Sequence, residues 1–390
     1  MAERPRYFWL GIVLALSIVA ACTIAAVSGA SSGSPTLDPL VTMQATAAAQ
    51  PPGIPMGLDY GATLFKAGAS AIADGLGDAT AVGDSWIRVD LPWDGIQPAN
   101  SRTTYDWSRF DTLVAAADER GLEMLVTVVD PPVWARDPSC ASNEACEPAS
   151  PQAYADFAAL AAQRYAQYGV HYWEIWNEEN LGSFATAASP EQSYTTLLQD
   201  TYIALHHADS KAVVILGGLG MTATVAGRHW ISAYTFLSGV AKDGGLGYAD
   251  AIGVHPYGWP YLPPASPVFE QIDSARQSLE TILNQYGRGS LPFWITETGA
   301  PTQGAGTAAA DASAATAAAT HVTESWQAKI ATATIATAAA DPHIKALFWY
   351  SDVDLPGSGL YFGLRTASGV DKPAFDALKT AIAAYRAKLR

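Results

Sequence analysis

From residue 55 onward, short strand-like apolar runs alternate along the chain with longer helix-like segments. Short, almost continuously apolar runs predict buried strands, and each run except perhaps the first is followed by a segment with helical spacing. We predict strands at residues 55–61, 85–93, 122–132, 171–180, 211–220, 249–258, 291–299 and 344–352. We predict helices at residues 108–121, 151–169, 190–209, 228–240, 267–287, 323–340 and 372–389.

Strands that are apolar on both faces are typical of parallel sheets covered by helices. Eight such strand–helix units predict an α/β fold, a (β/α)8 TIM barrel forming one catalytic domain over residues 54–390. An open doubly wound sheet is the alternative, but it would need a glycine-rich phosphate turn that GLDYGATLF (57–65) lacks. The Ala/Thr/Gly-rich run 304–320 is either a mobile flap or the start of a helix, and we favour a helix for its later half.

The N-terminal residues have the order of an export segment. Arg4 and Arg6 precede an apolar run at 7–27, and small residues follow at 28–30. Residues 1–30 are therefore an export signal, a retained membrane anchor or, from VAAC ending at Cys22, a lipoprotein signal. Residues 31–53 read as a flexible linker. We expect an extracellular or envelope-bound bacterial protein, whose N-terminal segment is the part that contacts a membrane.

The net charge limits the classes of molecule that the protein can bind, and the cysteine spacing indicates a cross-link. A net charge of −15 argues against nucleic acid and leaves neutral sugars possible. Cys140 and Cys146 lie close together in a polar stretch, so a small-loop disulfide is expected, with a metal pair as the weaker reading. No cluster of metal-ligating residues stands out, and we expect no metal, no cofactor and a monomer.

Polar residues at the C-terminal ends of the strands are the candidates for chemistry, because active sites of such barrels lie at that face. They are Asp59, Arg88, Asp90, Asp130, Asn177, Glu178, His255, Tyr257, Glu297, Trp349 and Asp352. Glu178 and Glu297 end the fourth and seventh predicted strands, which face each other across an eight-strand ring. Two carboxyl groups about 5 to 5.5 Å apart are what retaining hydrolysis of a glycosidic bond requires.

Each candidate also has an ordinary structural reading. A lone glutamate at a strand end is often only solvated, Arg88 could form a structural ion pair, and His255 could be a satisfied core histidine. Most tryptophans in a large barrel are packing residues. We nevertheless expect Trp349 to stack on substrate, with Trp93 and Trp134 in loops forming further subsites.

Two motifs carry a specific resemblance. IWNEEN (175–180) resembles the Asn-Glu signature that ends strand four of clan A glycoside hydrolases, and WITETG (294–299) resembles their strand-seven nucleophile motif. IRVDLPW (87–93), GVHPYG (253–258) and ALFWY (346–350) support the similarity, which covers residues 54–390 and is closest to families 39 and 5, cellulase-like or β-xylosidase-like. Glu179 occupies a position where these families usually have proline.

The resemblance implies a retaining O-glycoside hydrolase acting on an oligo- or polysaccharide. Glu178 would be the acid/base and Glu297 the nucleophile. The residues implied to line the substrate subsite are Asn177, Arg88, His255, Tyr257 and Trp349, with Asp130 as a weaker candidate. A glycan-binding barrel without catalysis and a transglycosylase with the same residues remain as alternatives.

Overall fold

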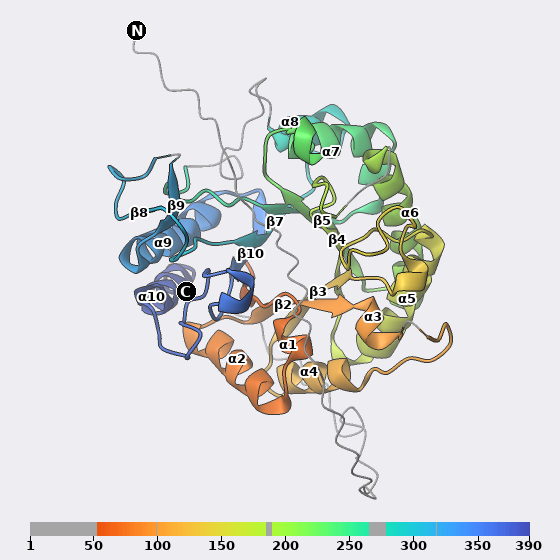
Figure 1. Cartoon of the computed structure of the whole chain (residues 1–390), viewed down its shortest axis with the longest axis horizontal. Helices are drawn as coiled ribbons and strands as arrows, with labels where there is room; N and C mark the ends of the chain where they lie inside the picture. The colour runs from red at the N-terminus through yellow and green to blue at the C-terminus, as the bar shows by residue number, and fades with distance from the viewer. Residues whose placement is uncertain (1–52, 99, 185–188, 265–277, 317) are drawn as a thin grey trace, which may run out of the picture.

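A closed ring of eight parallel strands surrounded by helices forms the protein (Figure 1). The computed structural model describes residues 53–98, 100–184, 189–264, 278–316 and 318–390. The barrel strands are β1 (Met56–Asp59), β2 (Trp86–Pro92), β3 (Glu123–Val129), β4 (Tyr172–Asn177), β5 (Val213–Gly220), β6 (Ala251–His255), β7 (Phe293–Thr298) and β10 (Ile344–Tyr350). They follow one another round the ring in chain order, and β1 pairs with β10. The predicted (β/α)8 barrel is confirmed.

The helices cover the outside of this ring (Figure 1). They are α1 (Thr63–Lys66), α2 (Ala69–Val82), α3 (Trp93–Ile96), α4 (Ser108–Asp118), α5 (Pro151–Tyr165), α6 (Pro190–Ala208), α7 (Ala233–Lys242), α8 (Leu279–Gln285), α9 (Glu324–Ala340) and α10 (Pro373–Ala387). Ser150, Ser232, Ser278 and Thr323 cap α5, α7, α8 and α9 by accepting a hydrogen bond from a backbone N–H of the first turn. Such caps contribute about 1 kcal/mol each.

Two sequence predictions need correction. The helix predicted from residue 228 begins only at Ala233, after a short 3-10 turn. The helix favoured for the later half of 304–320 is wrong: the described residues there lie in a bend and turn until β9 (Ala319–Val322) begins. β9 pairs with β8 (Thr307–Ala309) in a small parallel two-stranded sheet beside the barrel. Alanine favours a helix locally, but pairing between the two segments overrides that preference.

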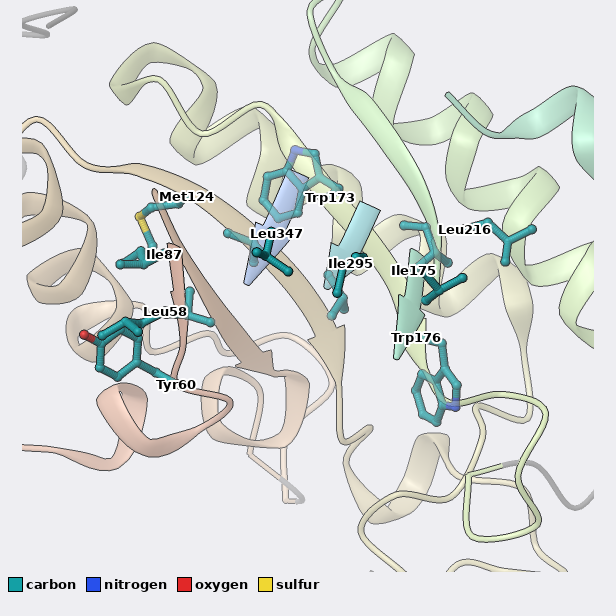
Figure 2. Close-up of a cluster of buried hydrophobic side chains, with 14 of the residues drawn as sticks. Leu58, Tyr60, Ile87, Met124, Trp173, Ile175, Trp176, Leu216, Ile295 and Leu347 are labelled. Carbon is teal, nitrogen blue, oxygen red and sulfur yellow. The ribbon is translucent and has the colours of Figure 1, made fainter. Parts of the chain in front are cut away.

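The strands alternate between two apolar clusters. One face contributes Trp86, Leu125, Ile215, Ala251, Trp294, Ala346 and Phe348, which pack together inside the ring. The other face packs against the helices and includes Leu58, Ile87, Trp173, Ile295 and Leu347 (Figure 2). Side chains of successive strand residues point to opposite faces. The inner positions nearer the carboxyl ends carry polar residues instead, and these form the face called the mouth below.

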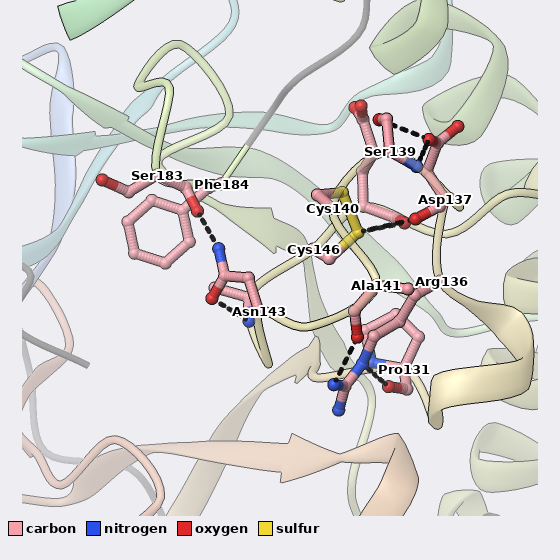
Figure 3. The surroundings of a disulfide bond; sticks show 12 residues. Pro131, Arg136, Asp137, Ser139, Cys140, Ala141, Asn143, Cys146, Ser183 and Phe184 are labelled. Atoms are coloured by element: carbon pink, nitrogen blue, oxygen red, sulfur yellow. Dashed lines mark hydrogen bonds between the residues drawn. A yellow bond between two sulfur atoms is a disulfide. The ribbon is translucent and has the colours of Figure 1, made fainter. Parts of the chain in front are cut away.

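The disulfide predicted between Cys140 and Cys146 is present, with the two Cα atoms 5.5 Å apart (Figure 3). It lies in the loop between β3 and α5. The predicted export segment 1–30 and residues 31–52 of the predicted linker lie outside the described residues. In the part of the chain that is described, no helix is both long and apolar enough to span a bilayer.

Candidate active site

The mouth brings together three of the predicted residues, which come from the ends of β4 and β6 and from β7. Glu178 follows β4, His255 ends β6 and Glu297 lies in β7. One carboxylate oxygen of each glutamate and one ring nitrogen of His255 all lie within 4.8 Å of one another. The two carboxylates therefore face a common point at the top of the barrel.

Arg88 on β2 lies inside the barrel beside these residues and binds Glu297 and three of its neighbours. Its side chain is 1% exposed, and its Nη1 lies 2.8 Å from Glu297 Oε1 and 2.9 Å from Asp59 Oδ2. Its Nε donates to Glu174 Oε2 at 2.7 Å, and its Nη2 donates to Asn177 Oδ1 at 2.8 Å. The rigid guanidinium fork thus fixes Glu297 and Asn177 relative to each other.

Two further side chains contact the carboxylates. The Tyr257 hydroxyl donates to Glu297 Oε2 at 2.8 Å. His255 Nδ1 lies 3.2 Å from Glu178 Oε1 and 3.6 Å from Glu297 Oε2, while its Nε2 lies 3.1 Å from Thr296 Oγ1. His255 therefore sits between the two glutamates and touches both.

These contacts drive the pKa values of the two glutamates apart. Burial raises the pKa of Glu178 and outweighs the opposing hydrogen bond and charge of His255. Burial also raises the pKa of Glu297, but the charges of His255 and Arg88 and the hydrogen bond from Tyr257 outweigh it, so that this pKa lies below the usual value. One carboxyl is thus biased toward the protonated form and the other toward the ionised form.

Local backbone irregularities aim these residues. Trp176 and Glu178 have φ values of 72° and 47°, in the left-handed region that residues other than glycine rarely adopt. The β7–β10 register shifts by one residue around Thr296 and Glu297, as it does between β5 and β6 at Gly217 and Gly218. Bulges of this kind re-aim side chains next to functional sites.

The Glu178, His255 and Glu297 atoms are close enough to hold a divalent cation. However, the Arg88 guanidinium already lies 2.8 Å from Glu297, and its positive charge opposes a cation at that carboxylate. The second such group, Glu280, Asp341 and His343, includes an exposed histidine far from the mouth in the fold. The expectation of no metal stays a prediction.

A family model for cellulase, glycosyl hydrolase family 5, matches residues 72–349, well over half of the chain. The chain belongs to that family. Its signature motifs and barrel place it among the clan A glycoside hydrolases, as the sequence motifs predicted. No curated protein matches it.

Solved structures share the fold of this family 5 chain at low identity. A family 39 glycoside hydrolase from Bacteroides cellulosilyticus WH2 is 19% identical, with a TM-score of 0.60; the match covers 84% of this chain and 63% of that one. A GH5_18 protein from Streptomyces cattleya in complex with GlcNAc is 19% identical, with a TM-score of 0.62 and coverage of 86% and 81%. A monomeric β-xylosidase from Caulobacter crescentus CB15 is 18% identical, with a TM-score of 0.58 and coverage of 86% and 70%.

Trp349 of this family 5 barrel does not reach the mouth. It is 2% exposed and shares the helix-facing cluster with Leu347, whereas Ala346 and Phe348 face the ring interior. By the same alternation the inward position at the end of β10 belongs to Tyr350, which pairs with Asp59. Burial raises the pKa of Tyr350, and the nearby charge of Glu297 raises it further. The structure thus gives the inward position to the residue after Trp349, and stacking on substrate at this strand end stays a prediction.

Of the other predicted substrate-binding residues, one is buried in the core and two are partly exposed. Trp93 is 1% exposed and stacks on Phe157 in the core, so it forms no subsite. Trp134 is partly buried and packs edge-on against Trp93, with the Arg102 guanidinium over its ring. Asp130 is partly exposed after β3 with a φ of 51°, and burial raises its pKa to about 6. Trp134 and Asp130 therefore remain candidates on the β3 side of the barrel.

Sequence reasoning missed Glu174, which accepts hydrogen bonds from Arg88 Nε at 2.7 Å and from Thr127 at 2.9 Å. The available signal in the sequence was a glutamate in the middle of an apolar strand-like run. Such a carboxylate is buried when the strand is, and it then needs a charged partner. Asp59 stood among the strand-end candidates without a role. Burial, opposed by Arg88, raises its pKa to about 7.

Proposed function

We propose that this protein is a retaining O-glycoside hydrolase of oligo- or polysaccharides, with Glu297 as the nucleophile and Glu178 as the acid/base. The observation that carries the proposal is the approach of the two carboxylates within 4.8 Å, oxygen to oxygen, in one mouth. Retaining enzymes hold these groups about 5 to 5.5 Å apart, whereas inverting enzymes need about 6.5 to 9.5 Å to admit a water.

In the first step, ionised Glu297 attacks the anomeric carbon and forms a glycosyl ester. Glu178 gives its proton to the glycosidic oxygen as that bond breaks, and the alcohol departs. In the second step, Glu178 takes a proton from water, and the resulting hydroxide attacks the same carbon. The sugar leaves, and Glu297 is ionised again.

The surrounding residues support these two roles. Arg88 and Tyr257 stabilise the negative charge of Glu297 before attack. Arg88 also donates a hydrogen bond to the oxygen of the Asn177 amide. The amide nitrogen of Asn177 is then the group that donates to a sugar hydroxyl near the reacting carbon. Tyr350 at the end of β10 would border the same sugar.

The same proposal places the enzyme outside the cytoplasm as a monomer, secreted or held at the envelope by its N-terminal segment. The basic, apolar and small residues of 1–30 support export, and the disulfide between Cys140 and Cys146 suits an oxidising compartment. Fractionation of the native host, followed by detection of the chain with an antibody, tests this part.

A mechanism-based 2-deoxy-2-fluoro glycoside tests the reaction itself. We expect it to inactivate the enzyme and to label Glu297, and NMR of the first product to show the anomer of the substrate. Labelling at another residue, or a product of inverted configuration, contradicts the proposal. Tight binding across a glycan panel without any labelling or turnover would instead identify a glycan-binding barrel.

A further inference from the structure

Asp90 is one of the predicted strand-end candidates, and the two-step reaction leaves it without a role. Val89 of β2 lies in the helix-facing cluster, whereas Arg88 points into the ring and contacts Glu297. The pairing of β2 with β3 has no register shift, so Asp90, two residues after Arg88, points into the ring as well. It lies nearer than Arg88 to the carboxyl ends of the strands and is partly exposed there. The Asp90 side chain therefore opens into the mouth.

The Asp90 carboxyl differs from its neighbours in having no partner among the residues that the structure describes. No group in that part of the chain donates a hydrogen bond to it, and it forms no ion pair there. Asp59 on the neighbouring strand β1 does have partners, because both Arg88 and the backbone N–H of Gly61 donate to it. Asp90 Oδ2 lies beside the same loop, 3.5 Å from the position that a Cβ atom on Gly61 would take. A polar group left without a partner in such a mouth is available to a bound ligand.

The charged neighbours of Asp90 place it on the side of the mouth where Glu297 lies. Burial raises the pKa of Asp90, and the charge of Arg88 opposes this rise. The carboxylates that raise the pKa further are those of Asp59, Asp130 and Glu297, and Glu178 contributes less than any of these. In the proposed reaction Glu297 bonds to one sugar, called the glycone below, and Glu178 serves the leaving group. Asp90 therefore faces the glycone.

The chemistry of the Asp90 carboxyl indicates which group of the glycone it binds. Burial and the neighbouring carboxylates favour its protonated form. A protonated carboxyl donates one hydrogen bond and accepts another, and a sugar hydroxyl does the same, whereas an ammonium group would require the ionised form. We propose, on the basis of the proposed function, that Asp90 binds a free hydroxyl of the glycone and thereby selects neutral substrates that carry no substituent at that position.

Hydrolysis kinetics of the full chain on 4-nitrophenyl mono- and disaccharide glycosides first identify the fastest neutral substrate. Asp90→Ala should lower kcat/KM on that substrate about tenfold or more, because a buried hydrogen bond to the sugar is lost. The monodeoxy forms of the substrate, each lacking one glycone hydroxyl, then locate the contact. We expect Asp90→Ala to cost about tenfold on all of them but one, and no more than about twofold on the form that already lacks the contacted hydroxyl.

Asp90→Asn keeps a donor and an acceptor in the same place, so we expect it to retain kcat/KM within about threefold of the wild type. Asp74→Ala, at an exposed aspartate of α2 outside the ring, is the control and should change neither series. If Asp90→Ala does not fold, Asp90→Ser, which withdraws the polar group from the sugar, replaces it in the same measurements.

Unchanged kcat/KM of Asp90→Ala, or an equal loss on the parent glycoside and on every monodeoxy form, overturns the inference, because Asp90 would then not contact the glycone. A loss with Asp90→Asn as large as with Asp90→Ala also overturns it. These outcomes leave the proposed hydrolysis intact. Failure of the wild type to hydrolyse any glycoside of the panel would instead overturn the proposed function and this inference together.

Discussion

Glu178 and Glu297 have identical side chains, and their neighbours alone shift their pKa values in opposite directions. His255 contacts both, at 3.2 Å and 3.6 Å, but Arg88 and Tyr257 contact only Glu297. Each carboxyl is thus paired with the protonation state that its proposed role requires. The difference resides in partners contributed by β2 and by the end of β6, which explains why no local motif around either glutamate encodes it.

The pH dependence of kcat/KM should be bell-shaped, because activity needs Glu297 ionised and Glu178 protonated. Both residues lose a contact that favours ionisation when His255 is replaced by Phe, since His255 lowers the pKa of each. We therefore expect both limbs of the profile of His255→Phe to move to higher pH. A profile that merely falls in height, without moving, would show that His255 is only a packing residue.

Glu178→Gln should lower kcat by about 10²- to 10⁴-fold on a substrate with a poor leaving group, because proton transfer to the glycosidic oxygen is lost. Aryl glycosides whose leaving group needs no proton should show a much smaller loss in the first step. Steady-state and burst kinetics with both substrate types measure this difference. Glu119→Gln, at an exposed glutamate beyond the end of α4, is the matched control and should leave both rates unchanged.

The residue types of the site could be read from the sequence, but the side that each residue faces could not. Asn177, His255 and Tyr257 lie at the ends of apolar runs and Arg88 lies within one, and their side chains meet at the mouth. Trp349 also ends such a run, yet Tyr350 takes the inward position. A shift of one residue reverses the face of a strand side chain, and sequence alone does not set that register.

At the level of elements, bulges on β5 and β7 shape the mouth. The extra residue in β5 lets Gly217 face the Glu179 carboxyl while Gly218 faces the His255 ring. A Cβ atom on Gly218 would collide with that ring. Glycine is therefore required at both positions because each faces a buried side chain at close range.

Gly218→Ala should displace His255 and lower kcat/KM by about tenfold or more, with a stability loss of about 1–3 kcal/mol from overpacking. Gly77→Ala, in α2, is the matched control because an added Cβ there meets nothing within 4 Å. That variant should keep full activity and gain up to about 1 kcal/mol. Activity assays and denaturant unfolding measure both effects; full activity of Gly218→Ala would contradict the assigned position of His255.

The disulfide closes a loop between residues only six apart in sequence. A short loop constrains the unfolded chain little, so we expect the double variant Cys140→Ser, Cys146→Ser to lose about 2 kcal/mol or less. Urea unfolding under oxidising conditions measures the loss, and the reduced wild type should match the variant. A loss of about 5 kcal/mol would mean that the loop supports the barrel itself.

The order of the elements was predictable because each strand is apolar on both faces and each helix on one. The β8–β9 segment was not, because its Ala/Thr/Gly residues carry no period and its pairing joins residues 12 to 13 positions apart. The distance between Glu178 and Glu297 could not be predicted from the sequence either. Their separation depends on closure of the ring and on local bulges, and neither motif specifies these.

At the level of the whole molecule, the net charge of −15 should influence which glycans approach the mouth. We expect an aryl glycoside of a neutral sugar to be hydrolysed at least about tenfold faster than the corresponding uronide at about 0.01 M salt. The gap should narrow at about 1 M salt, because the Debye length falls from about 30 Å to about 3 Å. Equal rates at low salt would show that the surface charge does not select the substrate.

Pairing between β1 and β10 joins Gly57 to Phe348, so the first and the last strand of the barrel lie side by side. At the far end, Tyr385 of α10 also accepts a hydrogen bond from the backbone N–H of Ile54. A growing chain can therefore assemble seven strands and still hold an open sheet with unsatisfied edges, and only the last strand removes them. Closing so long a loop carries a large entropic cost, so completion of the ring should be a late and slow event in folding.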